Sequence, residues 1–400
     1  MRTPVVLLAG HGDSKRVANA LMESPGTLVV GHEYDGQVVR RWVSIMRDGK
    51  ILTTELPLEL SNGCVCCTTR NDLLILLRRL HRRDDVSRIV VLLAAWLEPE
   101  PICVAINEVR VRVGPGYADG PAACDVRIEA VLTTIETSNW LPRALSTDEI
   151  DDGRTVAQVV VGQAEFADLL VLSEPDPCTL AVLRRLAPLA RITVGVDRVE
   201  QALGHLEPNT RRGRQRDPHE PLLRGQPPLD SAGEVTLVEF TARRPFHPQR
   251  LHAAIDVLLE GVVRTRGRAF VAHRLDDVMS IESAGGGVLV QHAGTWLAAM
   301  SPNELAYASP ERRALAAINW DDRFGDRHTS LTVLVCGAQP ADIESALRGA
   351  LLTDEELSRP DDWSHYPDPF GEWHSDPCED LPDAVDEFTA RPEHHGEEER

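Results

Sequence analysis

The sequence of 400 residues contains no apolar run that approaches the roughly 20 residues of a membrane-spanning helix. It also shows no secretory signal, because the apolar PVVLLAG at 4–10 is followed at once by the polar HGDSKR at 11–16. No internal repeat is evident. We therefore interpret the N-terminal run as a first strand, and we expect a cytoplasmic protein without a membrane partner.

A disulfide framework is missing as well. Five of the eight cysteines follow no regular spacing in this long chain, whereas disulfide-stapled domains are short and carry patterned cysteines. This distribution indicates a reducing compartment. The five scattered cysteines are Cys103, Cys124, Cys178, Cys336 and Cys378.

The other three cysteines, Cys64, Cys66 and Cys67, lie within GCVCCTTRNDL at 63–73. Neighbouring Cα atoms are about 3.8 Å apart, but bridged cysteines usually need about 4.4–6.8 Å, so Cys66 and Cys67 are poorly placed to bridge each other. A soft or borderline cation relieves the repulsion between crowded thiolates. We predict a metal site with Zn²⁺ as the first candidate and Cu(I) as the second. A redox cluster or plain buried thiols are the alternatives.

The formal net charge of −20 is concentrated near the C-terminus. Residues 354–400 hold seventeen Asp and Glu against three Arg, which leaves the rest of the chain nearly balanced. We expect the Pro-rich, acidic tail at 358–400 to be disordered or draped on the surface, and to suit a basic protein rather than DNA. Its metal-binding side chains could hold an ion weakly or be incidental: His365, His374, Cys378, His394 and His395.

Four hundred residues exceed what one core usually holds, so we expect two domains. In the first, residues 1–200, short apolar runs alternate with helical patterns, which is typical of an α/β domain with a mostly parallel sheet covered on both faces. These runs lie at 5–10, 27–32, 88–96, 127–137, 167–174 and 191–196.

Leucines recur with helical spacing at 73, 76, 77 and 80, just beyond the cysteines. We expect this amphipathic helix to start directly after the thiols. The cysteines would then occupy a loop at its N-terminus, where the helix dipole favours the thiolate form.

The composition changes at 201–233, where five prolines accompany a run of arginines, and we interpret this stretch as a linker. Residues 234–357 then combine several strand patterns with two helical patterns, which predicts a small α+β domain. We expect strands at 234–242, 268–274, 287–298 and 329–337, and helices at 245–262 and 341–352.

The loop after the first strand departs from the phosphate-binding pattern G-x-x-x-x-G-K-S/T. In register on Lys15, the two glycine positions hold Ala9 and Ser14, and the magnesium-binding hydroxyl is replaced by Arg16. Asp13 also brings a negative charge to the place where the anion would bind. Lys15 and Arg16 could still attract an anion, or the loop could be a plain strand-to-helix turn.

Further motifs follow in a fixed order after the altered loop and GCVCC: LEPEPI (97–102), ARRPFHPQRLH (242–252), Trp320, FGDRHTSL (324–331) and LLTDEE (351–356). In this order they resemble the CobW-like metallochaperone GTPases over nearly the whole chain except the tail. The resemblance implies a P-loop-like first domain, a CobW C-terminal domain and zinc binding by the GCxCC thiols.

The departures from that family concern nucleotide binding. Its ESTG-type segment is replaced by Leu92–Ala95, and its guanine-reading NKxD by Ser173–Asp176, of which only Asp176 could still bond a guanine edge. Because all three nucleotide elements are altered and the metal element is intact, we expect zinc binding to persist and GTP hydrolysis with its Mg²⁺ to be lost. The protein would then not be an enzyme.

Within this family the chain resembles a mycobacterial branch that recruits a hibernation-promoting factor to the ribosome when zinc is scarce. The resemblance lies in the cysteine segment, in 152–172 and in DPFGEWHSDPC at 368–378. It implies a zinc-responsive adaptor whose partners are that factor and the ribosome, with the small subunit as the expected binding site. The alternatives are a GTP-dependent zinc metallochaperone and a zinc-storage protein.

Candidate ligands and contact residues remain to be assigned. Relatives carry acidic ligands beside the P-loop, so we predict Glu33 as a further zinc ligand and His32 as the second choice, although both could simply be solvated. Two arginine groups could contact ribosomal phosphate or form solvated faces: Arg78, Arg79, Arg82 and Arg83, and Arg211, Arg212, Arg214 and Arg216.

Overall fold

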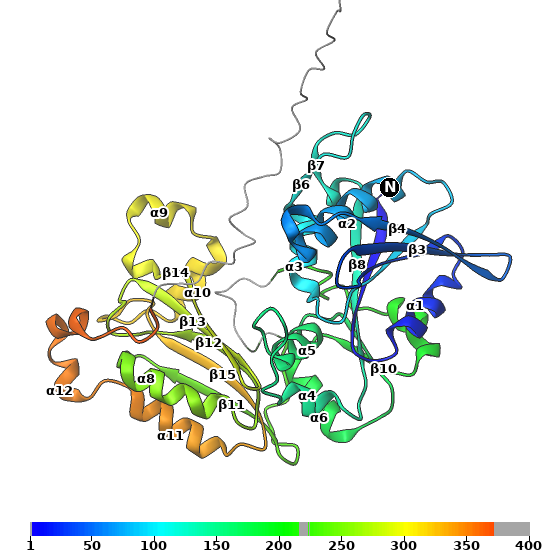
Figure 1. The fold of residues 1–400 in the computed structure, drawn as a ribbon. Helices are drawn as coiled ribbons and strands as arrows, with labels where there is room; N and C mark the ends of the chain where they lie inside the picture. The colour runs from blue at the N-terminus through cyan, green and yellow to red at the C-terminus, as the bar shows by residue number, and fades with distance from the viewer. Residues whose placement is uncertain (1, 216–222, 224, 372–400) are drawn as a thin grey trace, which may run out of the picture.

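The computed structural model describes residues 2–215, 223 and 225–371. They form two domains side by side, one built on an eight-stranded sheet and the other on a five-stranded sheet (Figure 1). This architecture confirms the predicted α/β domain followed by a smaller α+β domain. Within the described ranges, no helix has the length and apolar character needed to cross a membrane.

The first sheet has the strand order β10-β9-β8-β1-β5-β2-β3-β4. Neighbouring strands from β10 to β2 run parallel, and β3 and β4 extend the sheet as an antiparallel hairpin. The strands are β1 (Thr3–Gly10), β2 (Thr27–Tyr34), β3 (Val39–Arg47), β4 (Lys50–Leu58), β5 (Arg88–Leu92), β8 (Val126–Ile135), β9 (Leu169–Leu172) and β10 (Arg191–Val194). A separate short ribbon joins β6 (Arg110–Val111) to β7 (Gly120–Pro121).

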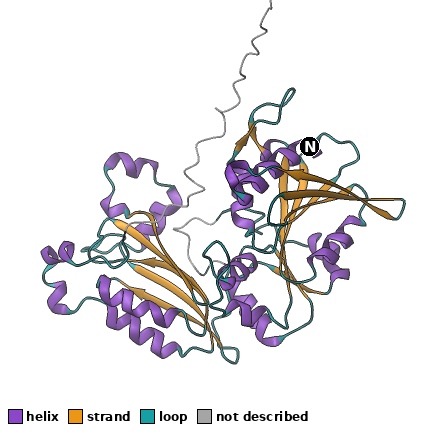
Figure 2. Ribbon diagram, viewed as in Figure 1, coloured by secondary structure: helices purple, strands orange, loops and turns teal. Residues whose placement is uncertain are grey.

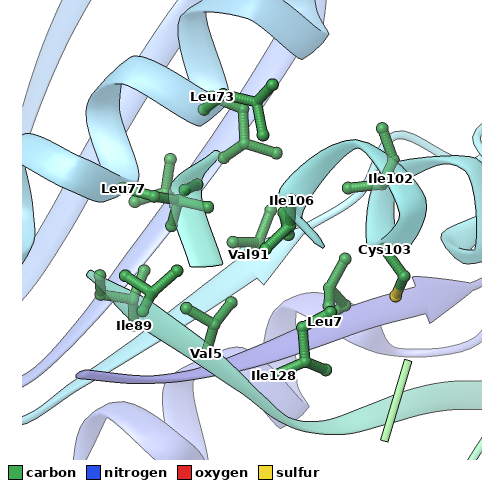
Figure 3. Packing of buried hydrophobic residues seen from close by; sticks show 14 of the residues in the cluster. Val5, Leu7, Leu73, Leu77, Ile89, Val91, Ile102, Cys103, Ile106 and Ile128 are labelled. Carbon is green, nitrogen blue, oxygen red and sulfur yellow. The ribbon is translucent and has the colours of Figure 1, made fainter. Parts of the chain in front are cut away.

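Helices cover both faces of this sheet (Figure 2). Val5 and Leu7 of β1 pack towards α2 and α3, whereas Val6 and Leu8 pack towards α1 and α7. Figure 3 shows the first of these clusters, with the leucines of α2 above the strands. The helices are α1 (Ser14–Met22), α2 (Val65–His81), α3 (Pro99–Glu108), α4 (Trp140–Ala144), α5 (Val156–Glu165), α6 (Pro177–Leu186) and α7 (Val199–Leu203).

The β3–β4 hairpin does not follow from the apolar runs, because most of β4 is exposed. The local signal that marks it is the pair Asp48-Gly49, whose φ angles are 51° and 71°. An Asp-Gly pair with two positive φ angles is typical of a tight hairpin turn. Turn chemistry, rather than hydrophobicity, therefore encodes this extension of the sheet.

The boundary predicted at residue 200 falls inside α7. Part of the chain beyond it packs on the first domain, since the buried carboxylate of Asp168 accepts a hydrogen bond from the Arg212 N–H at 2.9 Å, and Thr210 is buried. The beginning of the predicted linker at 201–233 therefore belongs to the packed structure. Residues 216–222 and 224 lie outside the described residues.

The second sheet is antiparallel throughout, in the order β11-β15-β12-β13-β14. Its helices α8 and α11 lie side by side on one face, where Leu251 and Leu347 pack on Phe240 (Figure 2). The elements are β11 (Val235–Ala242), α8 (Pro248–Ala254), β12 (Val262–Ala269), β13 (Asp277–Ala284), β14 (Gly287–Thr295), α9 (Pro302–Tyr307), α10 (Pro310–Ile318), β15 (Thr329–Cys336), α11 (Pro340–Ala350) and α12 (Asp354–Leu357).

The first part of the predicted acidic tail is structured. Trp363, in the 3₁₀ turn Pro360–His365, is buried against Leu352, and Asp368 forms an ion pair with Arg274. Residues 358–371 therefore differ from the expected loose tail, because one large aromatic side chain anchors them. The rest of the tail, including His374, Cys378, His394 and His395, lies outside the described residues.

The domains meet where α5 and α6 pack against the second sheet. Glu165, at the end of α5, lies 3.0 Å from the Arg264 guanidinium and 2.7 Å from that of Arg266. Glu282 of β13 completes the cluster at 2.5 Å from Arg264. Because all four groups are largely shielded from water, each charge depends on its partners for compensation.

Removing one carboxylate of this cluster should destabilise the protein. Glu165→Ala removes an ion-pair partner of both Arg264 and Arg266, and we expect the free energy of unfolding to fall by about 3–5 kcal/mol, as when a buried ion pair is broken. Urea unfolding followed by circular dichroism measures the change. As the matched control, Glu344→Ala breaks the exposed pair with Arg348 and should cost less than about 1 kcal/mol. Equal losses in the two variants would contradict this account.

Candidate metal centre

The three clustered cysteines lie at the start of α2. Cys64 is the N-cap residue and the helix begins at Val65, so Cys66 and Cys67 belong to its first turn. The prediction that the helix starts beyond the thiols is therefore wrong. A sulfur takes the place of the usual capping oxygen, since Cys64 Sγ accepts a hydrogen bond from the Cys67 N–H at 3.4 Å.

One hydroxyl group holds the cysteine loop closed. The Thr68 hydroxyl donates to the Cys64 carbonyl oxygen at 2.7 Å and accepts from the Ser61 N–H at 2.8 Å. Gly63 turns the chain into the helix with a φ of 70°, a conformation that glycine adopts without strain. The sequence interpretation missed Thr68, although a threonine four residues after a cap can make this contact.

The sulfur atoms are close enough to share one ion. The three Sγ atoms lie within 4.8 Å of one another, with 3.0 Å between those of Cys64 and Cys66. Tetrahedral zinc with Zn–S bonds of about 2.3 Å separates its sulfur ligands by about 3.8 Å, so small side-chain rotations would suffice. Cys67 is buried, whereas Cys64 and Cys66 are half-buried, which leaves the solvent side open to a further ligand.

The environment of Cys64 favours its thiolate. Burial alone would raise the pKa of Cys64, but hydrogen bonds from Cys66 and Cys67 outweigh it and lower this pKa to about 7. The thiolate is the form that binds metal. The cluster therefore presents a ready ligand near neutral pH.

The structure does not bring the predicted fourth ligands into this cluster. His32 is buried and its Nε2 lies 2.8 Å from Asp72 Oδ2 on α2, while Glu33 is exposed and forms an ion pair with Lys15 at 3.4 Å. Among the described residues, the group of three or more His, Cys, Asp or Glu residues whose metal-binding atoms lie within 4.8 Å of one another consists of Cys64, Cys66 and Cys67. Zinc ligation by Glu33 or His32 stays a prediction, and the contact that the structure shows for His32 connects β2 to α2.

A side chain of the altered phosphate loop caps the N-terminus of the helix that follows it, α1. The Asp13 carboxylate caps α1, accepting from the Arg16 N–H at 3.3 Å and pairing with the Arg16 guanidinium at 3.3 Å. The Lys15 side chain forms an exposed ion pair with Glu33. An internal carboxylate thus occupies the position that a bound phosphate would need.

The same loop rests tightly on β8. The Ser14 hydroxyl shares a hydrogen bond of 2.6 Å with the Thr134 hydroxyl, and a Cβ atom at Gly10 would lie 2.3 Å from the Thr134 carbonyl oxygen. Burial, followed by the charge of Arg143, lowers the pKa of His11 to about 4. His11 is therefore neutral at pH 7 and adds no positive charge for a phosphate.

Asp176 has a structural role in this arrangement. Its carboxylate caps α6 by accepting the Thr179 N–H at 2.7 Å, and this hydrogen bond lowers the pKa of Asp176. The guanine contact remains a prediction for this residue.

The arginines near the end of α2 make contacts inside the first domain. Arg78 is almost fully buried and donates to Asp125 at 2.7 Å, and Arg82 lies over the Tyr117 ring, 3.5 Å from its centre. The other described arginines of the two groups also have partners: Arg79, Arg83, Arg211, Arg212 and Arg214. Arg216 lies outside the described residues.

Replacing the loop-closing hydroxyl should loosen the metal centre. Thr68→Val removes both hydrogen bonds, and we expect a loss of about 1–3 kcal/mol in the free energy of unfolding because the Ser61 N–H and the Cys64 carbonyl lose their partner. Thr69→Val is the matched control, since no hydrogen bond of its hydroxyl is found in the described part of the chain. Chemical denaturation measures both variants. A Thr68→Val protein as stable as the control would show that the loop does not depend on this hydroxyl.

Comparisons with known proteins identify both domains. The nucleotide-binding domain of CobW/HypB/UreG matches residues 36–193, and the C-terminal domain of the cobalamin synthesis protein cobW matches residues 235–351. The first match includes the cysteine cluster and begins beyond the altered loop at 9–16.

Relatives match most of the chain. Zinc chaperone Rv0106 of Mycobacterium tuberculosis (strain ATCC 25618 / H37Rv) is 62% identical over 390 residues, which cover 98% of each chain. Zinc-regulated GTPase metalloprotein activator 1 of Dictyostelium discoideum is 25% identical over 357 residues, which cover 79% of this chain and 70% of that protein. The chain therefore belongs to the CobW family, with a CobW/HypB/UreG nucleotide-binding domain followed by a CobW C-terminal domain.

Proposed function

We propose that this chain is a cytoplasmic zinc-binding protein in which Cys64, Cys66 and Cys67 hold the ion. The observation that carries this proposal is the convergence of three sulfur atoms within 4.8 Å at the N-terminus of one helix. Thiolate ligands in this number suit Zn²⁺ or Cu(I). Two relatives are named for zinc, which supports Zn²⁺.

The geometry favours reversible binding. Three cysteines leave one position of a tetrahedral ion to an exchangeable ligand, and two of the three are half-buried at the surface. Metal binding would also change the hydrogen bond through which Cys64 caps α2. Zinc occupancy can therefore shift the cysteine loop between two arrangements, as a sensor or carrier requires.

We further propose that the protein does not hydrolyse GTP. Asp13 supports this, because its carboxylate already caps the helix terminus at which a phosphate would bind. Arg16 cannot supply the magnesium-binding hydroxyl of a phosphate loop. A GTP-dependent zinc metallochaperone is the second candidate, and the names of the two relatives favour it.

The finer proposal is that the protein acts as a zinc-responsive adaptor. It would recruit a hibernation-promoting factor to the ribosome, on the small subunit, when zinc is limiting. The support is the sequence resemblance together with the acidic C-terminal segment, whose charge suits a basic protein. We assign no phosphate contacts to α2, because Arg78 and Arg82 are engaged within the first domain.

Loss of two thiols should abolish metal binding. The wild-type chain should bind about one Zn²⁺ through three thiolates, and with Co²⁺ as a spectroscopic substitute it should show thiolate-to-cobalt charge-transfer absorption. Cys66→Ser/Cys67→Ser should lose both signals. The control is Cys124→Ser, which removes an exposed cysteine outside the cluster. Unchanged stoichiometry in the double variant would overturn the assigned site.

Nucleotide and ribosome assays separate the two candidate functions. We expect no GTP turnover above background, with or without zinc, because Asp13 and Arg16 disable the loop. We also expect the hibernation factor to sediment with small ribosomal subunits only when this protein is present and zinc is removed. Zinc-dependent GTP hydrolysis would instead support the metallochaperone function. If the hibernation factor sediments with small subunits equally well without this protein, the adaptor function would be excluded.

A further inference from the structure

Two cysteines outside the metal centre meet across the domain interface. Cys178 lies in the first turn of α6, in the first domain, and Cys336 is the last residue of β15, in the second. Both pack in the apolar cluster that also contains Leu334 of the second sheet and Val182 of α6. The two thiols are separated widely in sequence but are neighbours in the fold.

The two cysteines belong to packed elements and to one apolar cluster. Helix α6 packs against β15, and the Cys178 thiol lies near enough to Cys336 to raise its pKa. The Cys336 backbone is fixed by its N–H bond to the Gly261 carbonyl oxygen at 2.9 Å. Cys336 is buried, whereas Cys178 is half-buried. The Cys178 thiol is therefore accessible from solvent, whereas the Cys336 thiol is shielded from it.

We propose that Cys178 and Cys336 form a reversible disulfide that joins the two domains when the protein meets a peroxide. This inference does not depend on zinc binding. Because the two cysteines share one cluster between packed elements, side-chain rotations can bring their sulfur atoms to the roughly 2 Å of a sulfur–sulfur bond.

The reaction proceeds in two balanced steps. The Cys178 thiolate attacks one oxygen of hydrogen peroxide, which breaks the O–O bond, gives Cys178 sulfenic acid and releases hydroxide. The Cys336 sulfur then attacks the sulfenic sulfur, so that its thiol proton and the departing hydroxide leave as water. Two thiols are oxidised and one peroxide is reduced to two waters.

The surroundings divide these roles between the cysteines. Cys178 is half-buried in the first turn of α6, so peroxide can reach its sulfur from solvent. Burial, followed by the neighbouring Cys178, raises the pKa of Cys336 to about 11. The half-buried Cys178 is therefore the cysteine that attacks peroxide first, and the buried Cys336 resolves the sulfenic acid.

The proposed Cys178–Cys336 disulfide would restrain the contact between α6 and the second sheet. Cys178 lies two residues after Asp176, the cap of α6, and β15 is hydrogen-bonded to both β11 and β12. A covalent link there would hold α6 to the second sheet. It would also close a long loop of the unfolded chain, so the oxidised protein should unfold at a higher temperature than the reduced protein.

Peptide mapping tests the proposal on the full-length, zinc-loaded chain. Cleavage after Arg154 and Arg184 releases peptide 155–184, and cleavage after Arg327 and Arg348 releases peptide 328–348, each with a single cysteine. After treatment with hydrogen peroxide we expect the two peptides to appear linked, with the loss of two free thiols per chain. Dithiothreitol should separate them again.

Variants supply the controls. Cys178→Ser should abolish the linked peptide and the thermal shift, and Cys124→Ser, which removes an exposed lone cysteine, should preserve both. Cys336→Ala tests the second cysteine of the proposed disulfide. If the Cys336→Ala protein does not fold, the result for Cys178→Ser alone tests the proposal. Recovery of unlinked peptides after oxidation would overturn the proposal, as would linkage of either peptide to 51–70, which carries the metal cysteines.

Discussion

The packing of α2 on the parallel sheet is the constraint from which the metal centre follows. Leucines on one side of the helix are buried against β1 and β5, which fixes the axis and the rotation of the helix. Its first turn then carries Cys66 and Cys67 to the same place as Cys64. Because a helix N-terminus must satisfy free N–H groups, the sulfur of Cys64 serves both the helix and the cluster. Formation of the helix therefore also brings the three candidate metal-binding cysteines together.

Much of the fold could be predicted from hydrophobic pattern, and the exceptions have physical reasons. The central parallel strands β1, β5 and β9 are buried on both faces, so they appear in the sequence as continuous apolar runs. The exposed strand β4 and the segment anchored by Trp363 give no such signal. Their positions depend on a tight turn and on one tertiary contact. The start of α2 was misplaced because cysteine is not among the usual capping residues.

Part of the candidate site could likewise be predicted from the sequence, and part could not. Three cysteines within four residues can be recognised from spacing, because any backbone brings them together. A fourth ligand depends on tertiary distance, and the side chain of His32 turned out to face Asp72. Lys15 and Asp176 likewise occupy sequence positions typical of nucleotide contacts. In the structure, Lys15 forms a surface ion pair and Asp176 caps a helix. Sequence spacing alone cannot distinguish these roles from nucleotide binding.

The exposed strand β4 has a consequence for how this protein tolerates high concentration. An outer strand presents unpaired backbone groups that can recruit a strand from another molecule. Here Pro57 offers no N–H, and Lys50 and Glu55 place charges along the strand. Such residues make a sheet edge a poor template for intermolecular pairing. Pro57 and these charges therefore counteract intermolecular pairing along an edge that also exposes Ile51, Leu52 and Leu56.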